Sequence, residues 1–186
     1  MADRHVHVGG KRREWSKDKS WLMRLPQEDM CQALAVPIGR KYESDGAPGI
    51  PEILAFLLGS RQSRPDRRTF LKAQVLFWML GAVDGHARNF SIFIGRGGGY
   101  NMTPLYDVLS AYPLLGHGRN RLAPEKAKMA MAVRGRGKHY LWERITRNHW
   151  VETARVCGLE NEISLPGWWI RYYRDLGRRP EGWGNP

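Results

Sequence analysis

Apolar residues recur with helical spacing most clearly between Asp66 and Ala82. One face of that segment carries Phe70, Ala73, Phe77 and Leu80, and a second carries Leu71, Val75, Trp78 and Ala82. A helix that is apolar on most sides lies buried inside a domain. The pattern therefore predicts a buried central helix that Asp66 caps, and that ends where Gly81 and Gly85 allow a break.

A β-hairpin is predicted a few residues after this helix. Residues 90–94 are apolar and β-prone, and residues 100–103 supply a matching return strand. The turn between them, residues 95–99, contains three consecutive glycines, which adopt a positive φ without steric cost. The hairpin thus separates two loops that carry polar side chains.

Shorter patterns predict the elements nearer the N-terminus. Residues 21–25 form a short apolar strand that Pro26 ends, and residues 27–35 suit one or two helical turns. Pro51 opens a further helix over residues 52–59, because proline favours the first turn and glycine the position after the end. Residues 1–20 are polar, and we interpret them as a loose segment or a charged hairpin turn.

The C-terminal third is less regular. Residues 126–133 alternate lysine with apolar residues and fit either a strand or a helix. Residues 140–157 are predicted to be helical, in one piece or two, with Gly158 as the C-terminal stop, and residues 163–176 to form a last helix. The predicted fold class is mainly α with a small β-hairpin.

Composition narrows the class of protein. The chain has 186 residues, and a domain typically takes about 150, so we expect one domain. Its hydrophobic fraction of 42% and its eight tryptophans exclude disorder of the whole chain. The sequence contains no apolar run of about 18 residues and no apolar N-terminal core, so we expect no membrane association, no secretory signal and a cytoplasmic location. Cys31 and Cys157 lack metal-site spacing.

The charge is strongly positive. Thirty Lys and Arg against 18 Asp and Glu give a net charge of +12, which favours polyanionic partners. An arginine-rich surface without any such partner explains the composition equally well. The positive residues are spread along the chain and form no dense stripe, so we do not expect direct binding of nucleic acid.

Asp84, Asn89 and Asp107 form the constellation with a chemical meaning. Asp84 precedes Asn89 by five residues in one loop, and Asp107 follows beyond the hairpin. Phosphoryl transfer needs a carboxylate to orient an attacking hydroxyl, and amide and carboxylate oxygens to hold Mg²⁺. Protein kinases place a catalytic Asp, an Asn and a metal-binding Asp in this order. The sequence contains no literal HRD or DFG motif.

Structural interpretations compete with this chemistry at each position. An Asp-Gly pair often makes only a turn, and Asp107 is also able to cap a helix that begins at Val108. His86 either lines the site or hydrogen-bonds to the backbone, and Arg88 either neutralises charge there or lies on the surface. The order of the three residues after a buried helix favours phosphoryl transfer over the separate structural roles.

Four blocks of sequence give the chain a specific resemblance. They are AVDGHARNFSIFI at 82–94, GGYNMTPLYDVLSAYP at 98–113, MRLPQEDMCQAL at 23–34 and KYESDGAPGI at 41–50. Together they resemble the C-terminal part of HipA-type serine/threonine kinases, the toxins of bacterial toxin–antitoxin pairs. The resemblance covers about residues 21 to 160, and its blocks occur in the family's order.

The resemblance implies a kinase-like C-terminal lobe that uses ATP and Mg²⁺ to phosphorylate a protein serine or threonine. By motif, Asp84 is the catalytic residue and Asn89 and Asp107 are the metal ligands. His86 and Arg88, with Asn89, match positions that bind the cofactor. The implied partners are a HipB-like DNA-binding antitoxin and a protein substrate such as an aminoacyl-tRNA synthetase.

The family's N-terminal lobe, with its glycine-rich loop, phosphate-binding Lys and regulatory Ser, has no counterpart in this sequence. The resemblance thus implies a hinge remnant at 1–20, a catalytic lobe at 21–176 and a frayed tail at 177–186. Because kinase catalysis depends on positioning, we expect weak or no activity from this chain alone. A separate chain that supplies the N-terminal lobe is one alternative, and a non-catalytic module that binds the antitoxin is another.

Overall fold

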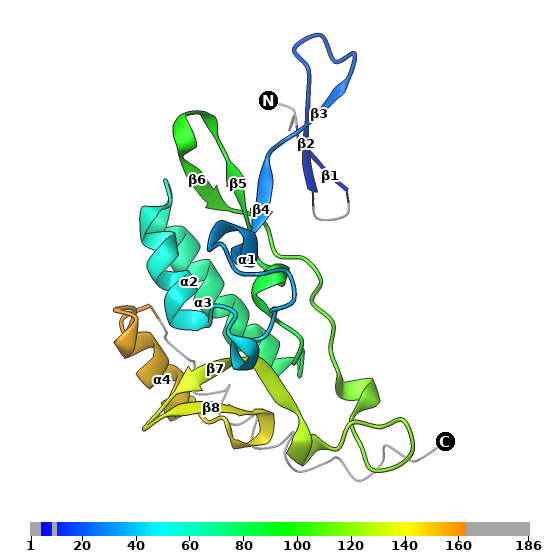
Figure 1. The fold of residues 1–186 in the computed structure, drawn as a ribbon, viewed down its shortest axis with the longest axis vertical. Coiled ribbons are helices and arrows are strands. Elements are labelled where there is room, and N and C mark those ends of the chain that lie inside the picture. Colours follow the sequence, from blue (N-terminus) through cyan, green and yellow to red (C-terminus); the bar gives the residue numbers. More distant parts are fainter. Residues whose placement is uncertain (1–4, 9–10, 163–186) are drawn as a thin grey trace.

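The computed structural model describes residues 5–8 and 11–162 (Figure 1). The predicted last helix at 163–176 and the predicted tail at 177–186 lie outside the described residues. Within them, helices form the centre of the molecule, two small antiparallel sheets flank the helices, and a third sheet projects away from them. The prediction of a mainly α fold with one hairpin therefore understated the β structure.

The predicted central helix is present as α3, Ser63–Met79. It begins three residues earlier than expected, because Pro65 lies in the first turn, where a missing N–H has no intrahelical partner to lose. Asp66, predicted as the cap, instead lies inside that turn and is buried. Its carboxylate accepts hydrogen bonds from the Ser60 hydroxyl and from the Met102 amide, the latter at 2.8 Å. Asp66 therefore ties α3 to the neighbouring hairpin.

Helix α2, Ile50–Phe56, lies beside α3 and continues into a 3₁₀ turn, Leu57–Gly59 (Figure 1). The prediction of a helix opened by Pro51 is confirmed. At its N-terminus the Glu52 carboxylate accepts a hydrogen bond from the Gly49 amide at 3.0 Å. This contact satisfies a backbone donor that would otherwise be unpaired.

The predicted hairpin is confirmed as β5, Ser91–Ile94, and β6, Tyr100–Met102. A third strand, β4, Gln27–Asp29, pairs antiparallel with β5 and places Glu28 opposite Ile92. The helical prediction for 27–35 was wrong for residues 27–29, which form β4. It was right for α1, Met30–Ala33, and Asp29 caps this helix. Pairing with a strand more than 60 positions away decided the conformation of β4, so the local pattern did not reveal it.

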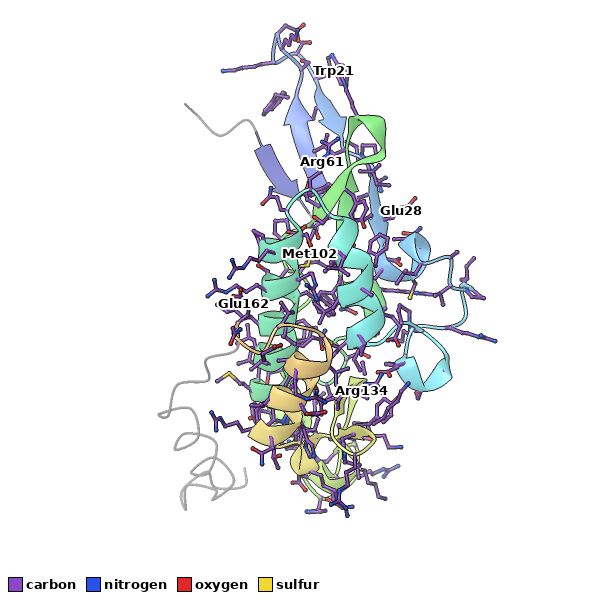
Figure 2. All side chains as sticks on the ribbon, turned by 90° about the vertical axis from the view of Figure 1, so that its left-hand side faces the viewer. Trp21, Glu28, Arg61, Met102, Arg134 and Glu162 are labelled. Atoms are coloured by element: carbon purple, nitrogen blue, oxygen red, sulfur yellow. The ribbon has the colours of Figure 1, made fainter. Side chains whose placement is uncertain are left out.

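The N-terminal residues form a second sheet, in which β1, His5–Val8, β2, Lys11–Trp15, and β3, Leu22–Arg24, pair antiparallel in sequence order. The strand predicted at 21–25 is confirmed, and the hairpin interpretation of 1–20 is the correct one of the two. Figures 1 and 2 show this sheet projecting away from the helices, with Trp21 near its far end.

Strands β7, Lys128–Arg134, and β8, Lys138–Leu141, form the third sheet, and α4, Arg147–Val156, packs against β7. The strand alternative for 126–133 is therefore correct, whereas the helix predicted from 140 was wrong at its start, which belongs to β8. Gly158, with a φ of +65°, follows the end of α4 and confirms the predicted stop.

Aromatic packing joins α3 to the elements around it. The Phe90 ring lies 4.8 Å from the Phe70 ring and 5.6 Å from the Phe77 ring, and the Trp78 and Trp150 rings are 5.8 Å apart. All five side chains are buried, which makes α3 the centre of the core as predicted. None of the helices in the described residues is long and apolar enough to cross a membrane.

Candidate functional site

The loop that follows α3 carries Asp84. After α3 the Ala82 amide donates a hydrogen bond to the Phe77 carbonyl at 2.8 Å, which turns the chain back toward the helix. Gly85 is buried against the Phe77 ring, and a Cβ at this position would collide with that ring. The Asp-Gly pair is therefore dictated by packing as well as by the turn, and this packing presents Asp84 at the surface.

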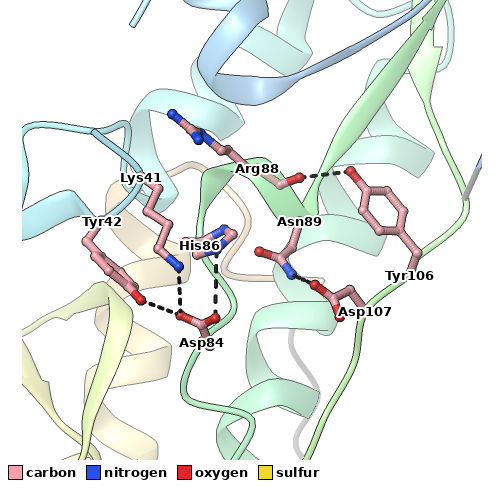
Figure 3. A network of polar contacts seen from close by, with 8 residues as sticks. All are labelled: Lys41, Tyr42, Asp84, His86, Arg88, Asn89, Tyr106 and Asp107. Atoms are coloured by element: carbon pink, nitrogen blue, oxygen red, sulfur yellow. Dashed lines mark hydrogen bonds and ion pairs between the residues drawn. The ribbon is translucent and has the colours of Figure 1, made fainter. Parts of the chain in front are cut away.

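Asp84 has three polar neighbours (Figure 3). Its Oδ1 accepts a hydrogen bond of 2.7 Å from the Tyr42 hydroxyl and lies 3.8 Å from the Lys41 Nζ. Its Oδ2 lies 3.8 Å from the His86 Nε2. The side chain nevertheless remains 64% exposed, so the carboxylate is both oriented and accessible.

Sequence reasoning missed the roles of Lys41 and Tyr42. They come from the loop before α2, and Tyr42 precedes Asp84 by 42 positions. No periodicity or spacing could connect residues so far apart. The only available signal was the block KYESDGAPGI, which supported the family resemblance without assigning a contact.

Asn89 and Asp107 are brought into direct contact, as Figure 3 shows. The Asn89 Nδ2 donates a hydrogen bond of 2.6 Å to the Asp107 Oδ2. Asn89 is 3% exposed, and its Oδ1 is buried without a hydrogen-bond partner among the described residues. Asp107 is exposed and has a φ of +57°, a conformation uncommon for residues other than glycine. Strained backbone of this kind often marks functional sites.

The oxygen atoms of this pair suit Mg²⁺. Amide and carboxylate oxygens are hard ligands. The buried Asn89 Oδ1 has no hydrogen-bond donor among the described residues, so it is free to bind a metal ion. Mg²⁺ usually keeps several waters and binds to proteins through few side chains. The described residues contain no group of three or more His, Cys, Asp or Glu that could hold a metal ion. The two residues therefore fit a partial ligand set and not a closed protein cage.

Tyr106 fastens the segment of Asp107 to the turn of Asn89. Its hydroxyl donates a 2.9 Å hydrogen bond to the Arg88 carbonyl and also contacts the Ser91 hydroxyl. Burial raises the pKa of Tyr106, so its hydroxyl stays protonated at neutral pH. Sequence reasoning did not identify this residue, although it immediately precedes Asp107.

His86 and Arg88 differ in how they face the site. The His86 ring is buried and lies edge-on to the Tyr42 ring, with centroids 5.7 Å apart. The Arg88 guanidinium donates to the Ile38 carbonyl and so points toward another loop, away from Asp84 in Figure 3. This contact favours the structural interpretation of Arg88, and cofactor binding by either residue stays a prediction.

The protonation of His86 predicts a pH dependence of stability. Burial lowers the pKa of His86 below its ordinary value near 6.5, although the charge of Asp84 opposes that shift. As the pH falls below about 6.5, the unfolded chain binds a proton that the folded chain resists. The free energy of unfolding should therefore decrease between pH 7.5 and 5.5, and His86→Gln should flatten this slope.

Urea unfolding of both proteins at several pH values measures the slope. His149 contributes in the same direction, because its pKa is lowered mainly by burial and also by nearby His139. Part of the slope should therefore remain in His86→Gln. His117→Gln is the matched control, since that side chain is 71% exposed. If the pH dependence of the free energy of unfolding is the same in His86→Gln as in the unmodified chain, His86 has the same pKa in the folded and unfolded states.

The site lies outside a cavity near β8. That cavity has a volume of about 360 Å³ and lies between the Glu43 loop and Lys138. Neither Asp84, Asn89 nor Asp107 lines it. Of the three, Asp84 and Asp107 are exposed, whereas Asn89 is buried.

Comparisons of sequence give the site a context. The model of a family described as the HipA-like C-terminal domain matches residues 3–166. The protein named Putative kinase Y4mE, from Sinorhizobium fredii, is 36% identical over 147 residues. That match covers 77% of this chain and 30% of the relative, so the chain spans less than a third of the relative's length.

Comparison of structures agrees at the level of the fold. HipA of the Shewanella oneidensis MR-1 toxin–antitoxin system, solved in a complex with HipB and its operator DNA, matches with a TM-score of 0.66. The match covers 94% of this chain and 42% of that chain at 19% sequence identity. The described architecture therefore corresponds to less than half of that neighbour.

Proposed function

The chain belongs to the family of HipA-like C-terminal domains, and from this premise we propose that it is the catalytic lobe of a toxin–antitoxin serine/threonine protein kinase. The proposed reaction is phosphoryl transfer from Mg-ATP to a protein hydroxyl. The observation that carries the proposal is the contact of Asn89 with Asp107, which leaves the Asn89 Oδ1 unpaired, beside a loop that exposes Asp84.

Each residue has a distinct role in this proposal. When bound, Mg-ATP supplies a phosphoryl group whose charge the metal partly neutralises. The Asn89 Oδ1 and the Asp107 carboxylate would hold the metal, and Tyr106 keeps their two segments together through its bond to the Arg88 carbonyl. The exposed Asp84 carboxylate would orient the acceptor hydroxyl and accept its proton.

The partners extend the proposal. The solved neighbour was captured with HipB and operator DNA, which supports a HipB-like antitoxin as the partner of this chain. The protein substrate that the resemblance implies is an aminoacyl-tRNA synthetase. Because the match spans 42% of the neighbour's chain, we propose that full activity requires an N-terminal lobe and that this chain alone is weakly active or inactive.

Calorimetric titration with ATP tests the proposed function. We expect binding of ATP in the presence of Mg²⁺ and much weaker binding after chelation, because the metal would connect the phosphates to Asn89 and Asp107. Transfer of labelled phosphate should then be measured with and without an added N-terminal lobe from a family member. Absence of both binding and transfer, with and without that lobe, would contradict the proposal.

A non-catalytic module that binds the antitoxin is the second candidate. It is favoured by the solvent exposure of Asp84 and Asp107, since an active kinase encloses its phosphates. Co-purification with a HipB-like protein, together with cellular effects that survive loss of the Asp84 carboxylate, would support this module. Loss of those effects on Asp84→Asn would argue for catalysis instead.

A further inference from the structure

We infer that Lys41 binds the phosphoryl group that is transferred at the Asp84 site, an inference that rests on the proposed function. A group carrying several negative charges cannot approach two carboxylates, Asp84 and Asp107, without nearby positive charge. The metal supplies part of that charge. A protein cation beside Asp84 would supply the rest at the point where the acceptor hydroxyl meets the phosphorus.

Among the described residues, the neighbours of Asp84 leave one residue for this task. His86 lies in the same loop, but burial lowers its pKa, so it is neutral near pH 7. The Arg88 guanidinium is committed to the Ile38 carbonyl. Lys41 is the remaining cation that the structure joins to Asp84, with its Nζ 3.8 Å from the Oδ1. Figure 3 shows that nitrogen directed at the carboxylate.

Lys41 is charged and able to reach a ligand. The pKa of its ammonium group is raised mainly by the contact with Tyr42 and also by the charge of Asp84. The side chain is 38% exposed, so a phosphate can approach it from solvent. Its Nζ also lies 4.7 Å from the centre of the Tyr42 ring, a cation–π distance that restricts where the ammonium can move.

Tyr42 holds the base and the cation in one arrangement. Its hydroxyl donates to the Asp84 Oδ1 at 2.7 Å while its ring lies beneath the Lys41 ammonium. One residue therefore orients the carboxylate that would receive the proton and supports the cation that would meet the phosphate.

The step balances without any change in Lys41. The acceptor oxygen forms a bond to the γ-phosphorus, and the bond from that phosphorus to the bridging oxygen breaks. The electron pair of the broken bond stays on ADP, and the hydroxyl proton passes to Asp84. Lys41 contributes only its positive charge. Its ammonium would give up the contact with the Asp84 carboxylate and bind an oxygen of the phosphoryl group.

The test compares Lys41→Met and Lys41→Arg with the unmodified full chain. Mg-ATP and Mg-ADP affinities are measured by calorimetry, and phosphoryl transfer is measured with an added N-terminal lobe. We expect Lys41→Met to weaken Mg-ATP binding about 10-fold to 100-fold, the range of a hydrogen bond to a charged group. Mg-ADP affinity should change less than about twofold, and Lys41→Arg should restore most of the loss. Lys126→Met is the control, since Lys126 is exposed on a different segment.

Three outcomes overturn the inference. Equal affinities for Mg-ATP in Lys41→Met and in the unmodified chain, with transfer intact, would reject the role of Lys41 and leave the proposed function standing. Equal loss of Mg-ATP and Mg-ADP binding with a lower unfolding midpoint would show that Lys41 is structural. Failure of the unmodified chain both to bind Mg-ATP and to transfer phosphate, with and without the added N-terminal lobe, would remove the proposed function together with this inference.

Discussion

Asp84→Asn should lower phosphoryl transfer by a factor of about 100 to 10,000, the range typical of a lost general base. An amide cannot accept the proton of the acceptor hydroxyl at neutral pH, although its oxygen can still accept the hydrogen bond of Tyr42. Mg-ATP binding should survive, because the proposed metal ligands are Asn89 and Asp107. The rate is measured as labelled phosphate transferred to a protein hydroxyl with an N-terminal lobe present.

Asp45→Asn is the matched control for this prediction. It makes the same chemical change at an exposed carboxylate, whose described contact is a 3.0 Å hydrogen bond from Ser44. We expect the control to transfer phosphate at the unmodified rate. A rate in Asp84→Asn within threefold of the control would exclude Asp84 as the proton acceptor.

Phe90→Ala should produce the largest loss of stability. Phe90 is 1% exposed, and its ring packs against the Phe70 and Phe77 rings at 4.8 and 5.6 Å. Removing such a ring from a core costs about 3–5 kcal/mol, because the cavity closes only partly. Domains are typically stable by about 5–15 kcal/mol, so the variant should lose a substantial part of its free energy of unfolding. Urea unfolding followed by tryptophan fluorescence measures the change.

The same variant connects stability to the site. Phe90 directly follows Asn89, and its carbonyl accepts a 2.9 Å hydrogen bond from the Met30 amide. Loosening Phe90 should therefore also weaken Mg-ATP binding. Leu109→Ala is the control, since that side chain is 74% exposed and its loss should cost less than about 0.5 kcal/mol. A loss below about 1 kcal/mol in Phe90→Ala would contradict the central place of this ring.

Local patterns predicted the elements whose conformation depends on near neighbours. Helix α3 was predictable because its apolar faces repeat with the helical period, and the β5–β6 hairpin because glycines mark its turn. Strand β4 was not predicted because it pairs with β5, more than 60 positions away along the chain. Strand β8 pairs with its neighbour β7 and was missed because residues 140–157 were interpreted as helical. The same limit explains Asp66, which was expected to cap α3 and instead binds the Met102 amide of β6.

The sequence by itself determined the candidate residues and their order. Asp84 and Asn89 stand five positions apart in one loop, and the hairpin that separates them from Asp107 has a clear local pattern. Only the tertiary structure decided which of these groups meet, namely Asn89 with Asp107 and Asp84 with Lys41 and Tyr42. Hydrogen bonds and ion pairs act over a few ångströms in space, and the packing of distant segments, not the distance along the chain, brings their partners within that range.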